Sequence, residues 1–226
     1  MTDMTPTREE RFPGFDTLQQ AHTWDDVTRE VVRARVEDVP PIAFLSAREE
    51  RTARVLLDRL LAQHGEPRVP VVELIDVRLA VGDGDGYRYA DMPEDGETWR
   101  RSLAGLDHDA RDKLGVGFDE IAIADQHAII QSIQDERGMW HELPAERVFG
   151  LWMRYACTAF YSHPWAWNEI GFGGPAYPRG YKNIGVGRRE PWEVAEVDAN
   201  DPVPWAQRVE AARRRHEQVM SPDASG

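Results

Sequence analysis

The sequence predicts an all-α protein with a single compact domain. Apolar residues recur at helical spacing in several segments, most clearly at Ala53, Leu56, Leu57, Leu60 and Leu61, which share one face of a helix. No segment shows the sustained alternation of apolar and polar residues that is typical of strands. Proline and glycine gather between the periodic segments, which indicates helices joined by irregular loops. With 226 residues the chain is long enough to bury one substantial core.

The net charge excludes several classes of partner. The chain has 27 Lys and Arg against 40 Asp and Glu, which gives a formal net charge of −13. Such a surface repels nucleic acid and anionic lipid, so neither is an expected partner. No apolar run reaches the roughly 20 residues that a membrane-spanning helix needs, so direct insertion into a membrane is not expected either.

The cysteine content and the N-terminus bear on the compartment. Cys157 is the only cysteine, so the chain cannot form an internal disulfide. The first residues contain neither an apolar signal segment nor a twin-arginine pair. Both observations lead us to expect a cytoplasmic protein.

The N-terminal part begins with a polar segment. Residues 1–11 are charged and polar, and we expect them to form a flexible arm ahead of a helical domain over residues 12–200. Apolar residues at helical spacing predict a first helix from Asp25 to Glu37. Pro40 follows closely and is expected to prevent its continuation.

Two further helices have clear start signals. Ser46 and Glu49 have the spacing of a capping box, in which each side chain accepts a hydrogen bond from a free backbone N–H at the helix start. Pro70 is well placed as the first residue of the next helix, since that position needs no backbone donor.

A long loop is expected from Val81 to Glu97. Asp83 and Asp85 alternate with glycines there, which leaves a calcium site open as an interpretation. The ligand spacing of an EF-hand loop is not met, so a polar turn is the favoured interpretation.

Three helices are expected in the middle of the chain. A short helix should contain Trp99, and Asp107 should cap a second one that ends at Leu114. Asp119 should then cap a third helix that continues to Gln134.

The most apolar helix should begin at Pro144, and its apolar residues cover most of its circumference, which places it at the centre of the domain. Cys157 on this helix and His127 on the preceding one are expected to be buried core residues. A charged helix is expected over residues 201–220, followed by a frayed tail at 221–226.

The stretch Ser162 to Tyr181, SHPWAWNEIGFGGPAYPRGY, is expected to be a loop without helix or strand, and irregular structure should continue to Trp192. Its shape should be set by prolines and glycines, namely Pro164, Gly171, Gly173, Gly174, Pro175, Pro178 and Gly180. Five aromatic residues lie between them, so the loop must pack against something. Loops of this length usually bind a ligand or a partner.

Motifs for catalysis or cofactor binding are not found. The seven histidines show no zinc-binding spacing, and the glycines at 171–174 lack the pattern and the lysine of a phosphate-binding loop. The aromatic residues of the long loop therefore either fill the domain's own core, form a protein interface or stack on a sugar. A stand-alone sugar-modifying enzyme or sugar-binding module is the alternative function, with His163, Asn168 and Glu169 as its polar residues.

Several motifs together resemble one known family. HPWAWNEIGFGGPAYPRGY, the preceding AFYSHP, LIDVRLA at residues 74–80, LGVGFDEIAIADQHAIIQSI and the early FPGFD turn are similar to the gluconate 2-dehydrogenase subunit 3 family. The similarity covers most of the chain, from about Phe12 to Trp192, and the long loop is its most specific part.

The resemblance implies a small, helical accessory subunit without catalytic residues, metal or cofactor of its own. Its expected partner is a large catalytic subunit of the glucose–methanol–choline (GMC) oxidoreductase type, which carries FAD and oxidises a sugar, sugar acid or glycoside. In some systems a cytochrome or another acceptor takes the electrons. Many relatives begin with a twin-arginine signal, which is not found here. The residues expected to form a combined core and partner interface are His163, Trp165, Trp167, Phe172, Tyr177, Arg179 and Tyr181.

Overall fold

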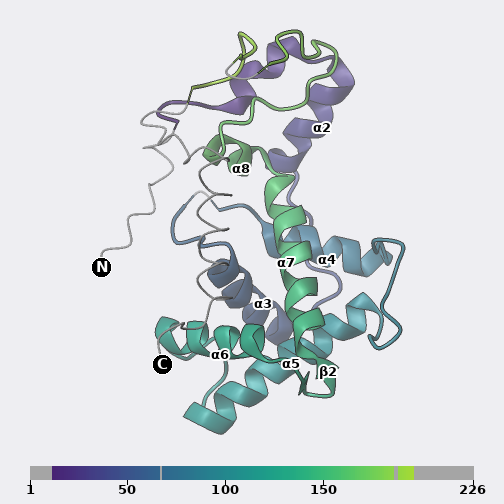
Figure 1. Ribbon diagram of the computed structural model, residues 1–226, viewed down its shortest axis with the longest axis vertical. Coiled ribbons are helices and arrows are strands. Elements are labelled where there is room, and N and C mark those ends of the chain that lie inside the picture. The colour runs from purple at the N-terminus through teal and green to yellow at the C-terminus, as the bar shows by residue number, and fades with distance from the viewer. Residues whose placement is uncertain (1–11, 67, 186–187, 196–226) are drawn as a thin grey trace, which may run out of the picture.

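The computed structural model describes residues 12–66, 68–185 and 188–195. Over these ranges the chain forms eight helices and one pair of two-residue strands, so the all-α prediction is confirmed (Figure 1). The elements are η1 Thr17–Thr23, α2 Asp26–Glu37, α3 Ala47–Leu60, α4 Val71–Val81, α5 Asp95–Leu114, α6 Ile123–Asp135, β1 Met139–Trp140, β2 Leu143–Pro144, α7 Ala145–Tyr161 and α8 Pro164–Glu169. The predicted arm 1–11, charged helix 201–220 and tail 221–226 lie outside the described residues.

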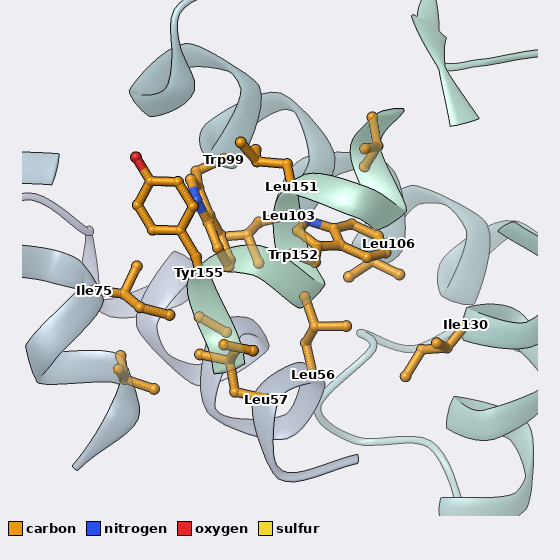
Figure 2. Packing of buried hydrophobic residues seen from close by; sticks show 14 of the residues in the cluster. Leu56, Leu57, Ile75, Trp99, Leu103, Leu106, Ile130, Leu151, Trp152 and Tyr155 are labelled. Atoms are coloured by element: carbon orange, nitrogen blue, oxygen red, sulfur yellow. The ribbon is translucent and has the colours of Figure 1, made fainter. Parts of the chain in front are cut away.

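The main core is built by α3 to α7. The α7 helix contacts α3, α4, α5 and α6, as its nearly continuous apolar surface predicts. Figure 2 shows Trp152 and Tyr155 of α7 among side chains of the other helices, with Tyr155 beside Trp99. Trp152 and Trp99 are both fully buried, and the Trp152 indole N–H donates to the Ser102 hydroxyl at 3.0 Å. None of the described helices is both long and apolar enough to cross a membrane.

The starts of α2 and α3 agree with the prediction to within one residue. The Asp25 carboxylate accepts from Thr28 N–H at the start of α2, and the Ser46–Glu49 capping box is complete at the start of α3. Pro70 is the cap of α4 and not its first residue, which is a shift of one position.

The α5 helix corrects the prediction of two short helices. It runs unbroken from Asp95 to Leu114, so the loop expected to reach Glu97 ends at Glu94. Asp107 caps no helix, because it lies in the middle of α5 with only 3% of its surface exposed. Its carboxylate accepts from Arg48 Nε at 2.5 Å and from Phe118 N–H at 3.0 Å. The polar residue that suggested a break therefore fastens α5 to α3 and to the chain that follows.

The α6 helix also starts later than expected. It begins at Ile123, while the predicted cap, Asp119, lies in the preceding turn and pairs with Arg51 at 3.1 Å. The prediction that His127 is a core residue is wrong, since its side chain is exposed. Cys157 is half-buried and free, so its full burial was also predicted wrongly.

A second, smaller hydrophobic cluster lies beyond one end of α7. It contains Ala21, Trp24, Val32 and Trp167, and it joins η1 and α2 to α8, at the top of Figure 1. We call η1, α2, α8 and the described residues 170–195 the aromatic lobe. Its two halves come from opposite ends of the described chain.

The segment that connects α2 to α3 is held by one buried carboxylate. Asp76 on α4 is fully buried. It accepts backbone N–H groups from Ala43 at 2.6 Å, from Phe44 at 3.0 Å and from Leu45 at 2.8 Å. The link between the aromatic lobe and the main core is thus anchored from inside the core.

Candidate partner-binding site

The stretch that was expected to contain no regular structure includes the α8 helix. His163 is its cap and Pro164 its first residue. A proline is compatible with a helix at this one position, since the first backbone N–H of a helix has no partner in any case. Only the part that follows α8 is irregular over the described residues.

His163 has a structural position. Its side chain is fully buried, and its ring nitrogen Nδ1 accepts from Trp165 N–H at 3.2 Å. The imidazole ring lies 4.7 Å from the Trp165 ring. Burial lowers the pKa of His163 to about 4, because the charged form loses its hydration; the Arg35 backbone opposes this by hydrogen bonding, and the Arg35 charge adds to it. The imidazole is therefore neutral, with its proton on Nε2, at neutral pH.

We expect this imidazole to make the stability depend on pH. In the unfolded chain its pKa is about 6.5, so between pH 4 and 6.5 the unfolded state binds more protons than the folded state. The contribution of the neutral imidazole to the free energy of unfolding should accordingly be complete above pH 6.5. It should fall by about 3 kcal/mol as the pH drops to 4. Urea unfolding at several pH values should show this slope in the wild type.

The control for this prediction is His163→Asn, which keeps a helix-capping side chain and removes the titrating group. The free energies of unfolding of the two proteins should converge as the pH falls from 6.5 to 4, because only the wild type has the imidazole. The carboxylates titrate in both proteins, so their effect cancels in the comparison. Parallel pH profiles for wild type and variant would contradict the prediction.

Trp167 and Asn168 join α8 to the N-terminal part of the lobe. Trp167 is only 5% exposed, and its indole N–H donates to the Tyr161 carbonyl at 2.7 Å. The Asn168 side-chain oxygen accepts from Thr17 N–H at 2.7 Å, and its amide donates to Asp16. Since His163 and Asn168 are both buried in structural hydrogen bonds, neither is available to a substrate in this conformation. That weakens the alternative of a sugar-modifying enzyme that uses these residues.

Three of the predicted loop-shaping glycines are needed for close packing, and at one of them, Gly173, a Cβ atom would lie 2.8 Å from the Trp192 ring. A Cβ atom on Gly171 would lie 2.5 Å from the Phe12 ring. On Gly174 it would lie 2.3 Å from the Trp24 ring, and Gly174 also has a φ of +81°, which disfavours other residues. Gly180 has a similar φ of +69°, but the space beside it is open.

Arg179 fixes the path of the loop after these glycines. Its guanidinium donates to the Thr23 hydroxyl at 2.8 Å and to the Gly173 carbonyl at 2.5 Å. It also stacks on the Trp192 ring at 3.6 Å, and burial lowers the pKa of the guanidinium. The two residues that precede Arg179, Tyr177 and Pro178, are joined by a cis peptide bond. The loop is thus tied to η1 and to itself, with a defined shape.

The structure separates the predicted interface residues into two groups. His163 and Trp167 are buried, while Trp165 and Arg179 are half-buried against the protein's own residues. Phe172, Tyr177 and Tyr181 are exposed, with 37%, 67% and 47% of their surfaces accessible. Ile170 and Ile184, which no sequence signal marked as interface residues, are also accessible, with 45% and 84% of their surfaces exposed. We call Ile170, Phe172, Tyr177, Tyr181 and Ile184 the exposed apolar surface.

The loop that suggested a calcium site has its carboxylates engaged by arginines. Asp83 and Asp85 both pair with Arg78, at 3.6 and 3.2 Å, and Asp85 also pairs with Arg154 at 2.5 Å. Arg78, Asp83 and Asp85 line an open hollow of about 780 Å³ whose wall also includes Tyr155. Burial, together with the hydrogen bond to Asp95, raises the pKa of the Tyr155 phenol. The hollow is lined by polar and apolar side chains together, and none of its lining residues belongs to the exposed apolar surface.

Comparison with known proteins gives one match. A family model described as gluconate 2-dehydrogenase subunit 3 matches residues 47–174. These residues include α3 to α8 and end at the glycine that packs on Trp24. No curated protein and no solved structure matches the chain.

Proposed function

Because the chain belongs to the gluconate 2-dehydrogenase subunit 3 family, we propose that it is a non-catalytic small subunit of a flavin-dependent dehydrogenase. In this proposal it binds a large GMC-type subunit and stabilises it or helps it to mature. The observation that carries the proposal is the exposed apolar surface, held in a fixed shape by the rest of the aromatic lobe.

The chemistry of the complex belongs to the partner. FAD binds to the large subunit, which oxidises a sugar, sugar acid or glycoside and passes electrons to a cytochrome or another acceptor. The small subunit adds stability, since a protein that binds only the folded state of its partner shifts that partner's folding equilibrium by mass action. The buried, structural positions of His163 and Asn168 support a role without catalysis for this loop.

The exposed apolar surface has the composition of an interface centre. Tyrosine is enriched among the residues that contribute most of the binding energy in protein interfaces, and Tyr177 and Tyr181 are both largely accessible. Arg179 holds the backbone around them, through hydrogen bonds to Thr23 and Gly173. A loop that is already ordered loses less conformational entropy when it binds, so more of the contact energy remains as affinity.

We expect the double variant Tyr177→Ser/Tyr181→Ser to lose its partner. An affinity-tagged chain expressed in its native cells should co-purify with a protein that shows flavin absorbance. The double variant should capture less than about a tenth of the flavoprotein that the wild type captures, since the loss of two central aromatic side chains costs more than about 1.4 kcal/mol of binding energy.

The matched control is Tyr87→Ser/Tyr89→Ser, which removes two tyrosines of similar exposure, 57% and 47%, from another face. It should co-purify with as much flavoprotein as the wild type, and thermal unfolding should show that both double variants are folded. Equal capture by a folded Tyr177→Ser/Tyr181→Ser variant would refute the interface. A flavin spectrum from the isolated small chain would refute the accessory role itself.

A further inference from the structure

Two histidines and one aspartate come together where the α5 helix meets the turn between β1 and β2. His108 and Asp109 lie on α5, and His141 lies in the turn between β1 and β2. One ligand atom from each of the three residues lies within 4.8 Å of the others. We propose that His108, Asp109 and His141 bind a divalent transition-metal ion of the Zn²⁺ type. This site is independent of the proposed partner interface.

The carboxylate of Asp109 is already oriented for this purpose. Its Oδ2 accepts from the Trp140 indole N–H at 2.8 Å. Its Oδ1 faces both histidines, 2.7 Å from His141 Nε2 and 3.7 Å from His108 Nδ1. Trp140 in turn packs edge-on against the buried Trp152, with ring centroids 5.8 Å apart. An outer hydrogen bond that fixes a ligating carboxylate is a regular feature of metal sites.

The backbone around His141 is arranged to bring its ring to Asp109. His141 and Glu142 form the two-residue turn between the strands and have φ values of +47° and +60°. Such a turn favours Asn and Gly, so two other residues in left-handed conformation indicate a constraint from the surroundings. Arg101 donates to the His141 carbonyl at 3.3 Å. At Gly105 a Cβ atom would lie 2.9 Å from the His141 ring, so the glycine permits the close approach.

The set of ligands suits a borderline metal ion. Imidazole nitrogens with one carboxylate oxygen bind Zn²⁺ and similar ions, whereas Mg²⁺ and Ca²⁺ prefer oxygen ligands alone. Ligand atoms about 2.0–2.2 Å from the ion would lie roughly 3.3 Å apart, so the ion would replace the proton shared by His141 and Asp109. His108 is 68% exposed and is free to turn toward the ion. Three protein ligands leave a fourth position for water or another donor.

The charges near the three residues are compatible with a cation. Arg48 and Arg111 share a shallow hollow with His108, but both are directed at Asp107, at 2.5 and 3.8 Å. Arg101 is paired with Glu142 at 3.6 Å. The chain as a whole carries a net charge of −13, which raises the local concentration of cations.

The test is isothermal titration of the full chain, without a histidine tag, with ZnCl₂ at neutral pH. The wild type should bind one Zn²⁺ ion saturably, and Mg²⁺ should not compete. His108→Ala, Asp109→Asn and His141→Asn should each weaken binding at least about tenfold. Asparagine is chosen at position 141 because it tolerates left-handed backbone. His127→Ala removes an exposed histidine on α6 and should bind Zn²⁺ like the wild type.

Three outcomes would overturn the proposal. They are the absence of saturable Zn²⁺ binding by the wild type, wild-type affinity in the His108→Ala variant, and equal weakening by His127→Ala, which would locate the ion elsewhere. His108→Ala changes only an exposed helix position, so it decides the question even if His141→Asn disturbs the turn. Thermal unfolding gives a second readout, because Zn²⁺ should raise the Tm of the wild type and not that of His108→Ala.

Discussion

Replacing Gly174 by alanine should disrupt the aromatic lobe and abolish flavoprotein capture. The new Cβ would lie 2.3 Å from the Trp24 ring, and Trp24 is only 3% exposed, so the ring has little room to move. Overpacking of this kind costs about 1–3 kcal/mol, and the left-handed φ of +81° adds about 1–2 kcal/mol. For a chain of 226 residues, a loss of about 3 kcal/mol corresponds to a fall in Tm of about 6–12 °C.

Gly180→Ala separates the two causes of this effect. Gly180 has nearly the same backbone conformation, φ +69°, but a Cβ there would meet no atom within 4 Å. Only the conformational cost of about 1–2 kcal/mol should remain. Each kcal/mol lowers the Tm by about 2–4 °C, and flavoprotein capture should persist. Equal Tm losses in the two variants would show that contact with Trp24 is unimportant.

Removal of the Asp76 carboxylate should destabilise the whole chain. In Asp76→Ala the backbone N–H groups of residues 43–45 lose an ionised acceptor that is fully buried. Hydrogen bonds to charged groups contribute about 1.5–3 kcal/mol each, and water can solvate the N–H of the exposed Ala43, so we expect a total loss of about 3–5 kcal/mol. That is a large part of the 5–15 kcal/mol that is typical of a folded domain. Urea unfolding at neutral pH measures the change.

Two comparisons make the Asp76 result specific. Asp112→Ala removes an exposed carboxylate on α5 and should change the free energy of unfolding by less than about 0.5 kcal/mol. Asp76→Asn keeps the shape and one acceptor oxygen, so its loss should be smaller than that of Asp76→Ala. If the free energy of unfolding of Asp76→Ala lies within about 1 kcal/mol of the wild-type value, this residue does not anchor the connecting segment.

Features encoded by neighbouring residues could be predicted from the sequence. The cap at Ser46 depends on residues three positions apart, and the α2 and α7 helices depend on their own apolar spacing. Asp107 misled the prediction because a polar residue inside a helix resembles a cap when its distant partner, Arg48, is unknown. The α8 helix was missed because it has only six residues, too few for an apolar helical pattern, and because Pro164 was interpreted as a helix breaker and not as a first helical residue.

The site was predicted as a segment but not in its detail. Sequence alone marked the stretch of residues 162–181 as unusual for a loop. It could not show that Trp167 faces inward and Tyr177 outward, because that depends on packing against α2 and η1. The same holds for the proposed metal ligands, since Asp109 and His141 are separated by 32 residues and match no motif.

The aromatic lobe is built from segments that lie far apart in the sequence, and this has a consequence for synthesis on the ribosome. The hydrogen bond from Thr17 to Asn168 joins residues 151 positions apart. At about 5–20 residues per second, the ribosome needs roughly 8–30 s to make the second partner after the first. During this interval Trp24 and Phe12 have no Gly174 or Gly171 to pack against, so the emerging chain presents unburied aromatic side chains. The α2 region must therefore wait for completion of nearly the whole polypeptide, and nascent-chain chaperones have their longest opportunity to bind there.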